Sequence, residues 1–80
     1  MREQQYQAKI IKKYEAHGYF VLNLIKTNCN GIPDLLCLKA NEAPMFIEIK
    51  AKKGVVSKLQ EYRIKQLKEK GFVAFVDRQP

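Results

Sequence analysis

Apolar and polar positions alternate along the 80-residue chain with two different periods, which together predict six elements. Apolar side chains recur every three or four residues over about 2–17 and over 57–70, a spacing typical of amphipathic helices. Four shorter apolar runs have the length of strands. These runs cover residues 19–25, 34–38, 45–49 and 72–77. The pattern therefore predicts the order helix, strand, strand, strand, helix, strand.

Residues that favour helix ends lie where this pattern needs them. Gly18 and Gly71 follow the two helical stretches, as expected of residues that adopt the left-handed conformation after a helix. Ser57 and Gln60 have the spacing of a capping box, which predicts that the second helix begins directly after Ser57.

The second and third apolar runs predict a β-hairpin, because turn-forming residues around Asn41 separate them. If the turn centres near Asn41, residues whose numbers sum to 82 face each other, and Asp34 lies opposite Glu48. Side chains alternate along a strand, so Lys50 shares the face of Glu48. Opposed residues have Cβ atoms roughly 4.5–5.5 Å apart. Two acids at that separation repel each other, and a divalent metal ion between them would relieve the repulsion.

The element order predicts a single α/β domain over residues 1–80, of α+β-like character. The third strand, the second helix and the last strand form a β-α-β unit with parallel strands, whereas short connections make the first three strands antiparallel. The expected core is therefore αβββαβ, with a four-stranded mixed sheet. Its two helices lie either on opposite sides of the sheet or together on one face.

The charge of the chain narrows the possible partners. Fifteen Lys and Arg residues oppose eight acids, giving a net charge of +7. Such an excess in a small domain favours a polyanionic partner, most often nucleic acid, although a basic surface can also serve solubility alone. No apolar run approaches the roughly 20 residues that span a bilayer, and the polar N-terminus does not resemble a signal peptide. We therefore expect a cytoplasmic protein and no membrane partner.

Each of the two hairpin acids also has a simpler interpretation. Asp34 could cap a turn after Pro33, and Glu48 could pair with Lys50 or Lys39 on an exposed sheet face. Taken together, these interpretations leave unexplained a glutamate that lies between two isoleucines of an apolar strand.

Three short motifs resemble those of the PD-(D/E)XK nuclease superfamily, and more narrowly of its VRR-NUC branch. They are Gly31-Ile32-Pro33-Asp34-Leu35-Leu36, Ile47-Glu48-Ile49-Lys50 and Ser57-x-x-Gln60. The resemblance covers nearly the whole chain, from about Glu3 to Asp77. It implies a small restriction-endonuclease-like core.

The resemblance also implies roles for the hairpin residues. Asp34 and Glu48 are similar to the family's metal-binding acids, and the backbone carbonyl of Ile49 to a further ligand. Lys50 is similar to the catalytic lysine. Oxygen ligands of this kind suit Mg²⁺ or Mn²⁺, and such a cation neutralises charge that develops during phosphodiester hydrolysis. One or two metal ions are compatible with these residues.

The two helices offer further candidates. The first helix of the superfamily often adds a glutamate, and Glu3 and Glu15 compete for that role. Glu3 is favoured because it lies on the inward stripe near the helix start, whereas Glu15 lies beside Gly18 at the far end. Gln60 is similar to the family's helix glutamine that reaches the active site, but the capping box also explains it.

The predicted function is a Mg²⁺- or Mn²⁺-dependent DNA endonuclease of phage-type replication or repair. By analogy with small nucleases that act as symmetric dimers, we expect a homodimer acting on branched or four-way junction DNA. Lys52, Lys53 and Lys58 are candidates for phosphate contacts without sequence readout. The alternative is a non-catalytic basic nucleic-acid-binding module on a degenerate nuclease fold.

Overall fold

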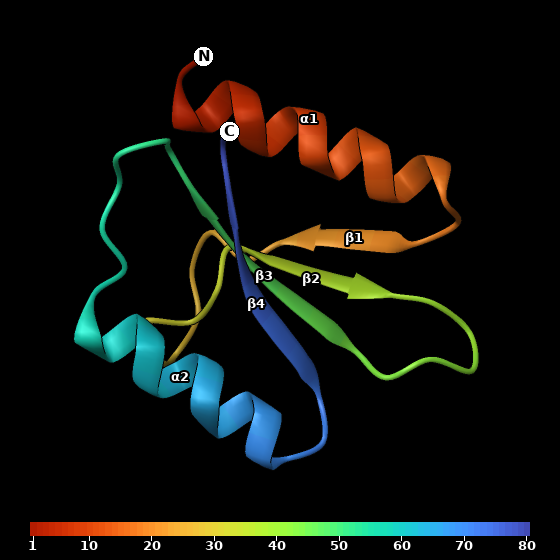
Figure 1. Ribbon diagram of the computed structural model, residues 1–80. Coiled ribbons are helices and arrows are strands. Elements are labelled where there is room, and N and C mark those ends of the chain that lie inside the picture. Colours follow the sequence, from red (N-terminus) through yellow and green to blue (C-terminus); the bar gives the residue numbers. More distant parts are fainter.

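The computed structural model describes all residues from Met1 to Pro80, and they form two helices and one four-stranded sheet. The elements, in chain order, are α1 (Glu3–Ala16), β1 (Phe20–Asn23), β2 (Leu35–Leu38), β3 (Met45–Lys50), α2 (Lys58–Glu69) and β4 (Val73–Arg78). The strands lie in the order β1-β2-β3-β4 (Figure 1). The β3–β4 pair is parallel and the other two pairs are antiparallel. The predicted αβββαβ order and mixed sheet are confirmed. Neither helix is long and apolar enough to cross a membrane.

Both helices end where the sequence predicts. Gly18 and Gly71 have φ angles of 88° and 90°, so each adopts the left-handed conformation after its helix. At the start of α2, the Gln60 backbone N–H donates to Ser57 Oγ at 3.1 Å, and the Ser57 N–H donates to Gln60 Oε1 at 2.9 Å. The capping box is therefore formed by both of its residues.

The hairpin register is the predicted one. Leu35 lies opposite Ile47, and the following pairs keep the same sum of residue numbers. Asn41 has a φ of 65°, as expected at the tight turn between the strands. Continued by one residue, this register places Asp34 opposite Glu48.

The first strand is shorter than predicted: it ends at Asn23, whereas the sequence predicted an end at Ile25. The Leu24 N–H still donates to the Asp34 carbonyl at 2.8 Å. The next residue of the neighbouring strand is Pro33, which has no N–H to continue the ladder. The chain therefore leaves the sheet at this point.

The two helices cover opposite faces of the sheet (Figure 1). Tyr6 and Ile10 of α1 pack in one buried cluster with alternate residues of the two central strands, namely Leu35, Cys37, Ile47 and Ile49. The residues between them face α2, which packs mainly against β4. Of the two arrangements left open by the sequence, the structure therefore has one helix on each side. Glu48 and Lys50 lie on the α2 side.

Candidate active site

Asp34 is held against the opposite strand of the hairpin. It follows Pro33 and directly precedes β2, and its Oδ2 accepts a hydrogen bond from the Ile49 N–H at 2.8 Å. This bond brings the Asp34 carboxylate to the C-terminal end of β3. The turn interpretation of Asp34 is therefore not the one that the structure adopts.

Glu48 is almost completely buried, with only 2% of its surface exposed. Its Oε2 accepts a hydrogen bond from Gln60 Nε2 at 3.0 Å and lies 3.4 Å from Lys50 Nζ. Its Oε1 is buried without any hydrogen-bond partner. A buried polar atom without a partner costs about 1–3 kcal/mol, and more when it is charged. Glu48 thus combines a firmly held oxygen with a second oxygen that can still accept a ligand.

The surroundings of Glu48 disfavour its ionised form. Burial is the main cause that raises its pKa, and the negative charge of Asp34 raises it further, to about 7. Lys50 acts in the opposite direction, and the charge of Glu3 adds a smaller increase. Near neutral pH the carboxyl group is therefore poised between its two forms, and a bound cation would favour the carboxylate.

Lys50 lies beside Glu48 but not on an exposed face. Only 15% of its side chain and 3% of the Glu48 side chain are exposed, so the Lys50–Glu48 ion pair is largely buried. Lys39 pairs instead with Glu42, at 3.9 Å. Glu48 therefore does not belong to an exposed salt bridge of the simple kind that the sequence also allowed.

The Ile49 carbonyl points toward the Asp34 side of β3. The Lys50 carbonyl accepts from the Gln79 N–H at 2.9 Å, on the β4 side of the strand. Because successive carbonyls of a strand point to opposite edges, the Ile49 carbonyl faces the other way. It thus lies on the same side as the carboxylate that binds the Ile49 N–H.

Gln60 makes both contacts that the sequence suggested for it. One end of its side-chain amide, Oε1, accepts from the Ser57 N–H, and the other end, Nε2, donates to Glu48. The capping box therefore orients the amide so that its N–H group reaches the buried carboxylate.

Of the two candidate glutamates of α1, Glu3 lies nearer to the site. It is the first residue of α1, and its charge contributes to the raised pKa of Glu48. Glu15 lies twelve residues further along, roughly 18 Å away at 1.5 Å per residue. No three His, Cys, Asp or Glu residues are close enough together to hold one metal ion. The structure therefore brings Asp34 and Glu48 together, with Glu3 outside that pair.

The loop after β3 and the first turn of α2 carry the predicted phosphate-contacting lysines. Lys52, Lys53 and Lys58 are all exposed, and none of them forms an ion pair. Sequence reasoning missed a residue that contacts this loop, because the last predicted strand ends at residue 77, one residue before Arg78. Arg78 is instead the last residue of β4 and donates to the Ala51 carbonyl at 3.1 Å.

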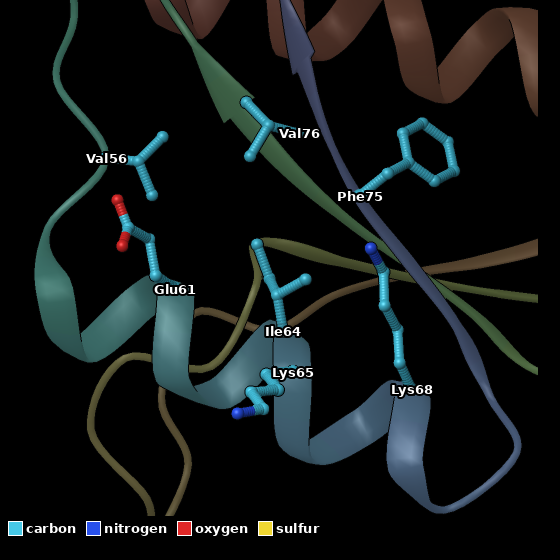
Figure 2. Close-up of a pocket in the computed structure, with 7 residues that line it drawn as sticks. All are labelled: Val56, Glu61, Ile64, Lys65, Lys68, Phe75 and Val76. Carbon is cyan, nitrogen blue, oxygen red and sulfur yellow. The ribbon is translucent and has the colours of Figure 1, made fainter.

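Asp34 lines two hollows on the surface. One, of about 440 Å³, lies between the first half of α1 and residues 23–25, and the other, of about 300 Å³, is formed by residues of the loop before Asp34. A third hollow, of about 460 Å³, lies between α2 and β4, where Ile64 and Lys68 point toward the strand (Figure 2). It contains none of the predicted site residues. Solvent can therefore reach the hairpin site through the two hollows that Asp34 lines.

A helix on each side of a mixed sheet, with an acid pair and a lysine at the end of its central hairpin, agrees with the resemblance found in the sequence motifs. The family model of the VRR-NUC domain matches residues 21–78, which is well over half of the chain. The chain belongs to the VRR-NUC domain family, within the PD-(D/E)XK nuclease superfamily. The match includes Asp34, Glu48, Lys50 and Gln60, and begins after Glu3. Searches of curated proteins and of solved structures gave no significant match.

Membership of this family implies a nuclease-type activity, with DNA as the substrate. Members of the superfamily usually use divalent metal ions. The family thus accounts for the basic charge of the chain and for the acids of the hairpin.

Proposed function

We propose that the protein is a Mg²⁺- or Mn²⁺-dependent endodeoxyribonuclease whose site is formed by Asp34, Glu48, Lys50 and Gln60. One observation carries this proposal: the buried Glu48 has one oxygen held by Gln60 and Lys50 and one oxygen with no partner. A carboxylate used only for stability would have its remaining oxygen satisfied.

The donor set fits a hard divalent cation. Mg²⁺ uses one or two carboxylates and keeps several waters, so Asp34 and Glu48 supply sufficient protein ligands. The Ile49 carbonyl and Glu3 are the further candidate ligands. When bound, the cation supplies charge neutralisation at the scissile phosphate and lowers the pKa of a bound water.

Each of the other residues has a role that follows from its contacts. Lys50 keeps a positive charge beside Glu48, where it can orient the attacking water or stabilise charge on the phosphate. Gln60 holds Oε2 of Glu48 and so leaves Oε1 for the ligand. Lys52, Lys53 and Lys58 contact DNA phosphates and position the duplex.

The test is a cleavage assay on labelled single-stranded, duplex, flap and four-way DNA, with Mn²⁺ and with a chelator. Wild type should cleave only with the metal ion. Asp34→Ala and Lys50→Ala should fold, as judged by circular dichroism, and should cleave at background level. Lys12→Ala on the exposed side of α1 is the matched control for loss of one positive charge. If Asp34→Ala and Lys50→Ala cleave DNA as fast as wild type does, the assignment of these site residues is refuted.

We further propose that the enzyme is a homodimer that selects branched or four-way junction DNA in phage-type replication or repair. It would act in the bacterial cytoplasm, or in the host cytoplasm if it is phage-encoded. One domain covers little DNA, and a two-fold dimer would place two sites against two strands. Phe20 and Leu22 on the edge strand β1 are 64% and 37% exposed, and they offer an apolar surface for a second copy. Light scattering that shows a monomer at assay concentration would remove this part of the proposal.

The net charge of +7 also supports a second candidate, a basic module that binds nucleic acid without cutting it. Such a module would bind DNA without a metal ion and with a steep dependence on salt. The cleavage assay distinguishes the nuclease from the binding module. Binding without cleavage under every metal condition favours the binding module, whereas metal-dependent cleavage excludes the binding module.

A further inference from the structure

The last two residues of β4 contact opposite sides of the molecule. Asp77 and Arg78 are consecutive in a strand, so their side chains point to opposite faces of the sheet. They are paired in register with Ile49 and Lys50 of β3. The end of this edge strand therefore lies directly beside the proposed site, although none of its residues belongs to the predicted acid and lysine set.

On the α1 side, Asp77 binds the hydroxyl of Tyr6. The Tyr6 O–H donates to Asp77 Oδ1 at 2.5 Å, and Tyr6 is only 8% exposed. The hydrogen bond to the carboxylate is the main cause that raises the pKa of Tyr6 to about 12. Tyr6 lies one helical turn after Glu3, so this contact fixes the end of α1 that carries the candidate glutamate.

On the α2 side, Arg78 binds the loop that follows Lys50. Its Nη1 donates to the carbonyls of Ala51, at 3.1 Å, and of Gly54. No acid pairs with the guanidinium, because the two ion pairs of the molecule involve other residues. The charge of Arg78 is thus used to hold backbone carbonyls and not to form a salt bridge.

The loop that Arg78 holds connects two members of the site. It begins after Lys50 and ends at Ser57, whose capping contacts orient Gln60 toward Glu48. It also passes close to the lysine itself, since a Cβ atom added at Gly54 would lie 3.4 Å from Lys50 Cδ. Movement of the loop would therefore disturb both Lys50 and the start of α2.

We propose that Asp77 and Arg78 are positioning residues of the nuclease site: Asp77 holds the Glu3 end of α1, and Arg78 holds the loop that sets Lys50 and Gln60. The proposal rests on the proposed function, because it concerns the same site.

The test uses Arg78→Ala and Arg78→Lys, with Lys12→Ala as the control for charge. Hydrogen exchange reads the loop directly, because the Gly54 N–H donates to the Ala51 carbonyl at 3.0 Å. Both Arg78 variants should exchange the Gly54 amide on the order of tenfold faster. Both should also cleave DNA on the order of tenfold more slowly. Lysine should not rescue, since its flexible ammonium group lacks the rigid guanidinium plane that places Nη1 against both carbonyls.

Two results would overturn the role of Arg78. Unchanged exchange of Gly54 would show that Arg78 does not hold the loop, and full cleavage by Arg78→Lys would show that only its charge matters. Exchange is measured without DNA or metal ion, so it remains decisive even if wild type proves inactive, a result that would instead refute the proposed function. If Arg78→Ala does not fold, Gly54 exchange and DNA cleavage are compared between Arg78→Lys and wild type instead.

The role of Asp77 is tested through its partner, with Tyr6→Phe, which removes one hydroxyl and keeps the buried ring. Tyr6→Phe alone should cleave DNA more slowly than wild type. The double variant Tyr6→Phe/Glu3→Gln should cleave at the same rate as Glu3→Gln alone, because Tyr6 acts through Glu3. A purely structural effect would be the same in both backgrounds and would overturn this half of the proposal.

Discussion

The side-chain amide of Gln60 links the start of α2 to the buried carboxylate of Glu48. Its Nε2 donates to Glu48 Oε2 at 3.0 Å, while its Oε1 accepts from the N–H of Ser57. A local capping motif thus orients a long-range contact between α2 and β3. This double use means that changes at Gln60 can separate helix stability from the state of the site.

Gln60→Glu should retain the helix cap and impair the site. A glutamate oxygen can still accept from the Ser57 N–H, and an acid is favourable in the first turn of a helix. It cannot donate to Glu48, however, and it adds a like charge beside it. We expect thermal stability below that of wild type at pH 8, because the buried Glu48 loses its donor, and DNA cleavage about 10–100-fold slower. Gln60→Ala should lose both contacts and also about 1 kcal/mol of stability, measured by urea unfolding. Wild-type cleavage by Gln60→Glu would show that the Glu48 contact has no part in the reaction.

Glu48→Gln should stabilise the protein at pH 8 in the presence of a chelator. The pKa of Glu48 is raised from 4.5 to about 7, so the folded state holds the proton more tightly than the unfolded state. Wild-type stability should therefore fall as the pH rises from 4.5 to 7 and remain low above that range. The loss is at most about 3 kcal/mol. Glutamine carries no proton to lose, so the variant should lack this decline. Urea unfolding at pH 5 and pH 8 measures it, and equal losses in the two proteins would contradict the prediction.

Mn²⁺ should stabilise wild type by binding to the folded site. A ligand present at 100 times its Kd stabilises by about 2.7 kcal/mol. The effect should be greater at pH 8 than at pH 6, because the cation must displace the proton of Glu48. Thermal unfolding with and without Mn²⁺ measures the shift. Asp34→Asn should lose it, whereas Lys12→Ala should keep it, and a shift that persists in Asp34→Asn would place the cation elsewhere.

Gly31→Ala should destabilise the protein more than Gly71→Ala does. Both glycines have positive φ angles, of 80° and 90°, so both variants carry backbone strain. A Cβ atom at Gly31 would lie 2.6 Å from Leu59 Cγ, whereas one at Gly71 would meet no atom within 4 Å. Overpacking of this kind costs about 1–3 kcal/mol, which is the expected difference in urea unfolding. Equal stabilities would mean that the loop before Asp34 does not pack firmly on α2.

The local features of this protein could be predicted from the sequence because neighbouring residues determine them. Gly18 and Gly71 end the helices, Ser57 begins α2, and the turn at Asn41 sets the hairpin register. That register, together with strand alternation, was enough to place Asp34 and Glu48 opposite each other. The VRR-NUC resemblance rested on the same local motifs, and the family match confirms it.

The tertiary structure alone decided the features that depend on packing between distant segments. It put the helices on opposite faces, buried Glu48, and joined Asp77 of β4 to Tyr6 of α1. Arg78 is the clearest example, because its carbonyl partners lie more than twenty residues earlier in the chain. No local pattern marks such a contact. Sequence periodicity reports which side of an element is apolar, but the depth of burial and the partners of a charge arise only when whole elements pack together.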